Sequence, residues 1–99
     1  MTIRHAAIFR LKHAEGSAEE AAFLVALAGL HSIPGVGDFA IAREVSPKNA
    51  FAIAVSMTFA DRVAYDYYND HPTHVDFVNN RWMPEVADFM EHDTVPLAP

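Results

Sequence analysis

The stretch of sequence that decides the fold is YYNDHPTHVDF, residues 67–77. Its proline, Pro72, disfavours helical backbone at His71, so a helix capped by Asp61 must stop or kink there. The same proline suits the first turn of a new helix, which we expect over about 73–83. The stretch therefore predicts a helical segment that is broken in the middle, with a histidine on each side of the break.

Apolar periodicity and turn signals predict the other elements outward from this break. Ser17 and Glu20 have the spacing of a capping box, which opens a helix running to about His31. Four segments alternate between two faces as strands do: 3–11, 37–45, 50–59 and 86–95. This order is the ferredoxin-like β-α-β-β-α-β arrangement. We therefore predict one α+β domain over residues 1–99, whose antiparallel sheet is covered by both helices on one face.

The second face of the predicted sheet carries small side chains rather than charged ones. In segment 50–59, Ala54 and Ser56 alternate with large apolar residues, and Ala6 and Ile8 stand on the alternate face of the first strand. A sheet face that contacts water is normally polar. The chain is also 52% hydrophobic at only 99 residues, which is much apolar surface for a small core. We therefore expect a homodimer in which two sheets pack face to face.

Composition excludes several classes of function. Lys and Arg number 7 against 13 Asp and Glu, for a formal charge of −6, and no basic run interleaves with aromatic residues, so we expect no nucleic-acid partner. The absence of cysteine excludes disulfides and thiol nucleophiles. The first residues lack the pattern of a signal peptide, and the longest apolar run is far below a membrane span. We expect a cytoplasmic protein with no membrane partner.

Candidate functional side chains come from the first strand and from the helix break. His5 lies in an apolar strand, where it is either a buried structural residue or faces a pocket together with Phe9. His74 lies in the first turn of its helix, which disfavours the imidazolium and predicts a low pKa. A neutral His74 beside the Tyr68 phenol could remove a proton from an acidic carbon. His71 is suited to backbone geometry before the proline, and we include it with Phe9 as a predicted ligand contact.

A metal or cofactor site is not expected. His71 and His74, with Asp70 or Asp76, form a partial ligand set, but the proline between the histidines spoils a regular helical face. No phosphate loop, Rossmann glycines or HExxH motif is present. We therefore predict no metal and no cofactor.

The chain resembles the stress-responsive A/B barrel (Dabb) domains, a branch of the dimeric α+β barrel proteins. The matching pieces are IRH at 3–5, IPGV at 33–36 and HPTHV at 71–75, and the likeness covers essentially the whole chain. The resemblance implies the ferredoxin-like fold and pairing into a barrel-like homodimer. Known members include plant stress proteins without agreed chemistry and a polyketide cyclase that closes a ring by aldol-type chemistry. By resemblance to that cyclase, its catalytic positions correspond to His5, His74 and Tyr68.

Two hypotheses about function stay open at this point, and with them the question whether the protein is an enzyme. In the first, it is a cofactor-free acid/base cyclase or isomerase acting on a carbonyl or aromatic substrate. His74 is then the base, Tyr68 its partner, and His5 orients or polarises the substrate. In the second, it is a non-catalytic, stress-associated or ligand-binding dimer whose pocket holds a small apolar molecule.

Overall fold

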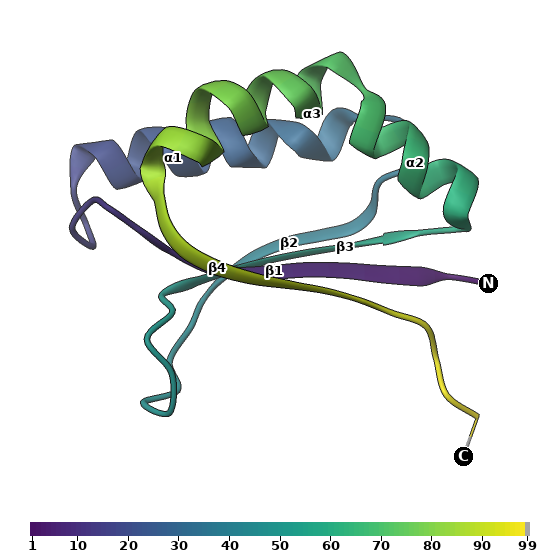
Figure 1. Ribbon diagram of the computed structural model, residues 1–99, viewed down its shortest axis with the longest axis horizontal. Helices are drawn as coiled ribbons and strands as arrows, with labels where there is room; N and C mark the ends of the chain where they lie inside the picture. The colour runs from purple at the N-terminus through teal and green to yellow at the C-terminus, as the bar shows by residue number, and fades with distance from the viewer. Residues whose placement is uncertain (99) are drawn as a thin grey trace.

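The computed structural model describes residues 1–98 and confirms the predicted order of elements. The strands are β1 (Ile3–Leu11), β2 (Gly37–Arg43), β3 (Ile53–Phe59) and β4 (Val86–Thr94). The helices are α1 (Ala18–Ala28), α2 (Arg62–Asp70), α3 (Pro72–Phe77) and α4 (Met83–Glu85), with a 3-10 turn η1 (Gly29–Ser32) and a π turn η2 (Val78–Trp82). Figure 1 shows two layers, in which the helices cover one face of the sheet. The fold is the ferredoxin-like α+β arrangement.

The sheet is antiparallel throughout and has the order β2-β3-β1-β4. Strand β1 is central, and its register sets His5 opposite Met57 on β3 and opposite Asp93 on β4. Directly opposed residues of antiparallel strands project to the same face with their Cβ atoms about 5 Å apart. Strand pairing alone therefore brings a carboxylate from the end of the chain against a histidine from its beginning.

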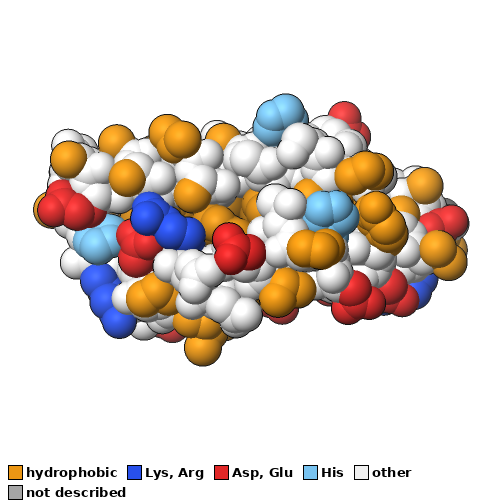
Figure 2. All heavy atoms as spheres, turned by 90° about the horizontal axis from the view of Figure 1, so that it is seen from above, with side chains coloured by type: hydrophobic (Ala, Val, Ile, Leu, Met, Phe, Trp, Pro, Cys, Tyr) orange, Lys and Arg blue, Asp and Glu red, His pale blue; other side chains and the backbone are white. Residues whose placement is uncertain are grey.

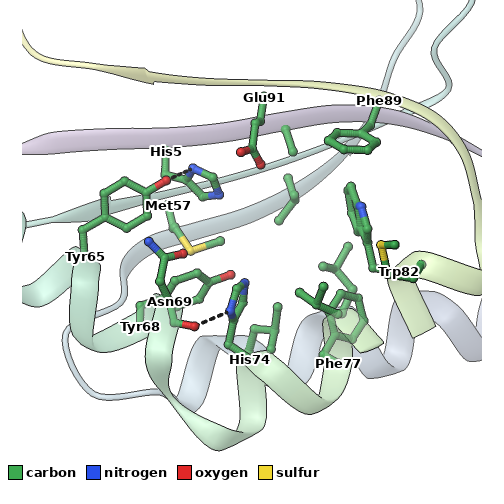
Figure 3. A pocket seen from close by; sticks show the side chains of 16 residues that line it. His5, Met57, Tyr65, Tyr68, Asn69, His74, Phe77, Trp82, Phe89 and Glu91 are labelled. Atoms are coloured by element: carbon green, nitrogen blue, oxygen red, sulfur yellow. Dashed lines mark hydrogen bonds between the residues drawn. The ribbon is translucent and has the colours of Figure 1, made fainter. Parts of the chain in front are cut away.

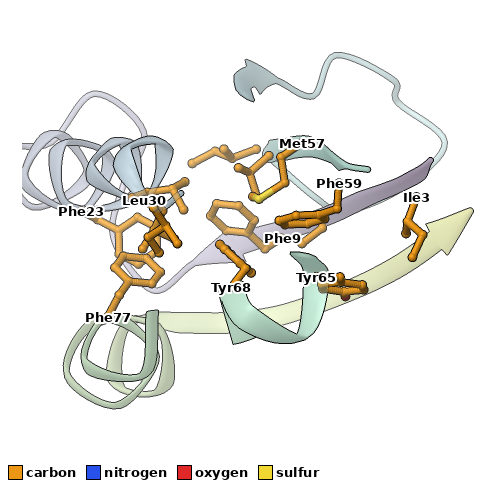
Figure 4. Close-up of a cluster of buried hydrophobic side chains, with 14 of the residues drawn as sticks. Ile3, Phe9, Phe23, Leu30, Met57, Phe59, Tyr65, Tyr68 and Phe77 are labelled. Carbon is orange, nitrogen blue, oxygen red and sulfur yellow. The ribbon is translucent and has the colours of Figure 1, made fainter. Parts of the chain in front are cut away.

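The core lies between the sheet and the helical layer, as Figure 4 shows. Alternate residues of β1 from Ile3 to Leu11 are buried, as the alternation predicted. Phe9 has no exposed surface and packs its ring 5.8 Å from Phe23 of α1 and 4.8 Å from Trp82 of η2. Each fully buried side chain of this size contributes roughly 1.5–3 kcal/mol through removal of apolar surface from water. This aromatic cluster holds α1 and η2 on the sheet.

The helix break is where the sequence predicted it. His71 has an extended backbone (φ −63°, ψ 134°), α2 ends just before it, and α3 begins with Pro72. The His71 side chain caps α3, because its Nδ1 accepts a hydrogen bond from the Thr73 N–H at 3.1 Å. His71 therefore satisfies a backbone donor that the new helix start would otherwise leave free.

The helix predicted over 73–83 is instead in three parts. After α3 the Met83 N–H donates to the Val78 carbonyl, five residues back, so the chain makes one wide π turn before α4. Pro84 follows immediately, and it has no N–H with which to continue a regular helical ladder. The wide turn carries Val78 and Trp82 toward the sheet, where both help to line the cavity described below.

Glu20 is a buried charge that ties β2 to the start of α1. The Ser17 hydroxyl caps α1 by accepting from the Glu20 N–H, as the capping-box spacing predicted. The Glu20 carboxylate does not return to the cap residue; it accepts from the Gly16 N–H at 3.1 Å and from both terminal nitrogens of Arg43 at 3.0 and 3.1 Å. The Arg43 hydrogen bonds, more than the Gly16 bond, hold the pKa of Glu20 below its usual value.

The two outer surfaces of the molecule differ in character. Figure 2 looks onto the helical layer, where hydrophobic side chains are scattered among charged and histidine side chains, as is normal for a face in water. The opposite face of the sheet has no helix over it in Figure 1, and its central positions are small or apolar, among them Ala6, Ile8, Ala54 and Ser56. No helix within residues 1–98 is long and apolar enough to cross a membrane.

Candidate functional site

A cavity of about 270 Å³ lies between the sheet and the broken helix. Strands β1, β3 and β4 form one wall, and α2, α3 and η2 form the other, with the end of α1 closing one side. Figure 3 shows the polar groups gathered at one end of the cavity and mostly apolar side chains at the other. The lining residues are His5, Ala7, Leu27, Leu30, Val55, Met57, Tyr65, Tyr68, Asn69, His74, Phe77, Val78, Trp82, Met83, Phe89 and Glu91.

His5, Asp93 and Tyr65 form a compact hydrogen-bonded triad beside this cavity. The distance from His5 Nδ1 to Asp93 Oδ1 is 2.6 Å, and the Tyr65 hydroxyl lies 2.9 Å from His5 Nδ1 and 2.9 Å from each Asp93 oxygen. Since a carboxylate only accepts, the His5 Nδ1–H and the Tyr65 O–H both donate to Asp93. A neutral His5 then has its lone pair on Nε2, and Figure 3 shows this second nitrogen turned toward the cavity.

Burial keeps the two cavity tyrosines protonated. Burial, with Asp93 and Glu91 nearby, raises the pKa of Tyr65 well above its ordinary value. Tyr68 is only 2% exposed, and burial together with the charge of Glu91 raises its pKa in the same way. Both phenols therefore act as hydrogen-bond donors at neutral pH rather than as phenolates.

His74 is held in the same manner as His5 but by a backbone acceptor. Its Nδ1–H donates to the Asn69 carbonyl at 3.0 Å across the helix break, which leaves Nε2 to the cavity. Burial lowers the pKa of His74, and the neighbouring His5 lowers it further. The predicted direction is confirmed, although desolvation is the leading cause rather than the helix terminus. The Tyr68 and His74 rings lie 4.4 Å apart, and within residues 1–98 no hydrogen bond joins them.

Two residues predicted to contact a ligand do not line the cavity, and the expectation is corrected for both. Phe9 is covered by Trp82 and Phe23, so its ring belongs to the core, and Ala7 takes the cavity position on the same strand face. His71 turns its ring toward Tyr67, at 5.6 Å, and uses Nδ1 to cap α3. The geometry thus brings together three of the five predicted residues: His5, Tyr68 and His74.

Besides Asn69, whose carbonyl holds His74, three further polar residues of the site were missed from sequence. Asp93 and Glu91 are two apart on β4, which gives them the same inward face, and Tyr65 stands one helical turn before Tyr68 on α2. The signal was present in the period-two spacing of the last strand, which puts both carboxylates on one face, although this edge strand leaves them exposed. An inward carboxylate opposite an inward histidine is a pair that strand register would have predicted.

Within residues 1–98 the cavity does not gather a set of metal ligands. Among residues 1–98, no group of three or more His, Asp or Glu side chains is arranged to hold a metal ion. His71 and His74 point to different partners, so the partial ligand set considered from sequence is not assembled. The arrangement instead places two imidazole rings and two phenol hydroxyls around one cavity, and such groups can transfer protons.

The protein is thus a small ferredoxin-like α+β domain with a cavity between its sheet and its helices. Comparison of the chain with known proteins identifies its family. The model of the stress-responsive A/B barrel domain matches residues 3–96, so the chain belongs to the Dabb family. No curated protein matches the chain.

Solved structures extend this comparison. A Dabb family protein from Mesorhizobium loti is 52% identical, with 98% of each chain covered and a TM-score of 0.95. A dimeric ferredoxin-like protein of unknown function from Thermobifida fusca is 23% identical over 97% of this chain and 92% of that one, with a TM-score of 0.81. A hydroxynitrile lyase from Passiflora edulis is 14% identical over 99% and 95%, with a TM-score of 0.86. The two lower identities show a common fold alone.

Proposed function

We propose that this protein is a cofactor-free acid/base catalyst, a cyclase or isomerase, that acts on a small carbonyl or aromatic compound. The observation that carries the proposal is the convergence of two imidazoles on one cavity. In both His5 and His74 an acceptor holds Nδ1–H, and Nε2 is turned toward the cavity. In its neutral form each histidine of this tautomer offers the Nε2 lone pair as a proton or hydrogen-bond acceptor within one apolar enclosure.

The environments of the two histidines divide the roles between them. Burial favours neutral His74, so His74 is the base. Asp93 lies 2.6 Å from His5 Nδ1 and fixes the ring with Nε2 toward the cavity, so His5 orients the substrate as a hydrogen-bond acceptor. Tyr68, whose phenol stays protonated, is the donor to the substrate oxygen.

Proton transfer follows from this division. His74 Nε2 takes a proton from the carbon next to a carbonyl, and the C–H electron pair forms a C=C bond while the carbonyl π pair moves to oxygen. A hydrogen bond from the Tyr68 hydroxyl stabilises the enolate oxygen. The nucleophilic carbon then attacks a second carbonyl in a cyclase, or is reprotonated elsewhere in an isomerase, and His74 returns its proton.

Proton exchange tests this function without knowledge of the natural substrate. Small ketones such as acetophenone are incubated with the protein in D₂O, and loss of the α-proton signal is followed by NMR. We expect the protein to accelerate exchange, and His74→Ala to reduce the acceleration by about 10²–10⁴-fold, the usual contribution of a positioned general base. His31→Ala, which removes an exposed histidine of η1, is the matched control. Equal rates for His74→Ala and the parent protein would remove the base assignment.

A non-catalytic ligand-binding role is the second candidate, and one observation favours it. Tyr68 and His74 contact each other through their ring faces rather than through a hydrogen bond, and most of the cavity wall is apolar. Such a cavity holds a small apolar molecule without turnover. Binding of small ketones with no exchange of their α-protons would select this alternative.

We also propose that the working form is a homodimer joined through the open sheet face. The support is the row of small and apolar side chains there, with Ala6 opposite Ser56 and Ile8 opposite Ala54. The Thermobifida fusca protein of the same fold is described as dimeric. Sedimentation equilibrium tests the proposal, and a monomer at micromolar concentration would contradict it.

A further inference from the structure

Glu91 is a solvent-exposed carboxylate of β4 that lines the cavity and has no partner within residues 1–98. It alternates with Phe89 and Asp93 on the inward face of β4. Asp93 is engaged by His5 and Tyr65, but within residues 1–98 Glu91 forms neither an ion pair nor a side-chain hydrogen bond. Figure 3 shows its carboxylate directed toward the space between His5 and the aromatic side chains.

The charges around the cavity are all of one sign. None of the sixteen lining residues is Lys or Arg, and Glu91 is the only Asp or Glu among them. A second carboxylate, Asp93, stands directly behind His5. The field of Glu91 reaches the working groups, because it contributes to the shifts in pKa of Tyr68 and His74. A cleft lined by one sign of charge concentrates ligands of the opposite sign and repels those of its own.

Aromatic rings stand beside this carboxylate. Phe89, two residues away on the same strand face, packs edge to face against Trp82 with ring centroids 5.4 Å apart. Figure 3 shows Glu91 and Phe89 on the strand side of the cavity, with Trp82 of η2 reaching toward Phe89 from the helical side. A carboxylate next to aromatic faces is a favourable environment for an ammonium group, which gains both an ion pair and cation–π contacts.

We propose that the cavity selects its ligand by charge, and that the substrate class is a small apolar carbonyl or aromatic compound carrying a protonated amine. The amine binds to Glu91 beside the rings of Phe89 and Trp82, and the reacting carbon lies toward His5 and His74. Carboxylates and phosphates are disfavoured, since the lining offers them no cation. The inference rests on the proposed function in one respect: it assigns a substrate class to the same cavity.

Three probes of nearly equal shape test the inference: phenethylamine, phenethyl alcohol and phenylacetate. Their affinities are measured at neutral pH by calorimetry or NMR titration. We expect the amine to bind about tenfold more tightly than the acid, with the alcohol between them, because Glu91 attracts the amine and repels the acid. Glu91→Gln lowers the amine affinity by about tenfold, raises that of phenylacetate and leaves the alcohol nearly unchanged. Added salt weakens amine binding to the parent protein.

Glu19→Gln is the matched control, because it makes the same change of net charge at an exposed position of α1 outside the cavity. It leaves the order of the three probes unchanged. Equal affinity for amine and acid, the same order in Glu91→Gln, or no binding of any probe would each overturn the inference. Binding and catalysis separate cleanly in these measurements. Amine preference without proton exchange would refute the proposed catalysis alone, and exchange on ketones without amine preference would refute this inference alone.

Discussion

Replacement of Asp93 by asparagine tests the division of roles between the two histidines. Asp93 accepts from His5 Nδ1–H at 2.6 Å and from the Tyr65 hydroxyl at 2.9 Å, so both donors rely on one carboxylate. In Asp93→Asn, the amide has one acceptor oxygen for two donors, and its NH₂ group favours the His5 tautomer with the proton on Nε2. The cavity-facing lone pair of neutral His5 is then lost, together with the charge-assisted hydrogen bond from its Nδ1–H to the carboxylate, which is worth about 1.5–3 kcal/mol.

That free energy corresponds to a fall of roughly 10–10²-fold in the rate of α-proton exchange, since each 1.4 kcal/mol is about a factor of ten. Nitrogen-15 chemical shifts of the imidazole report the tautomer directly, so the assay reads both cause and effect. We expect Nδ1–H in the parent protein and Nε2–H in the variant. Asp88→Asn, an exposed position on the same strand, is the control. A parent protein with Nε2–H, or a variant with unchanged tautomer and rate, would refute the reasoning.

Three further predictions concern His74, the Glu20–Arg43 pair and the open sheet face. Because burial lowers the pKa of His74, the exchange rate should be constant at neutral pH and fall as His74 is protonated, with a midpoint below pH 6.5 in a pH–rate profile; a midpoint above 6.5 would contradict the burial argument. Glu20→Ala should lower the free energy of unfolding by about 1–3 kcal/mol in urea, because it removes the hydrogen bonds that the Glu20 carboxylate accepts from Arg43 and from the Gly16 N–H. Because the pKa of Glu20 is lowered in the folded protein, this stabilisation is present above pH 4.5 and is lost as the pH falls through the folded-state pKa. An unchanged urea midpoint for Glu20→Ala at neutral pH would contradict the prediction. Ile8→Glu, on the open sheet face, should convert the proposed dimer to monomer in light scattering at little cost to the helical content; a persistent dimer would exclude this face as the interface.

Local rules account for most of the fold. The break at Pro72 follows from the restriction that proline places on the preceding residue, and β1 follows from strict alternation between two faces. The predicted ends of the elements were less accurate where a turn competes with strand pairing. Strand β3 begins at Ile53 rather than at residue 50, since Asn49 accepts from the Phe51 N–H and holds the chain in a turn. The π turn was missed because it depends on how Trp82 packs against the core, which no local pattern records.

The sequence by itself determined the order of the elements, the site of the helix break and three side chains of the cavity, because periodicity and proline act over a few neighbouring residues. Only the tertiary structure decided what those side chains do. Asp93 lies 88 residues from His5 along the chain and reaches it through strand pairing, while Trp82 covers Phe9 and removes it from the cavity. Hydrogen-bond partners and burial arise from contacts between distant segments, and these contacts set the tautomers and pKa values on which the proposed chemistry depends.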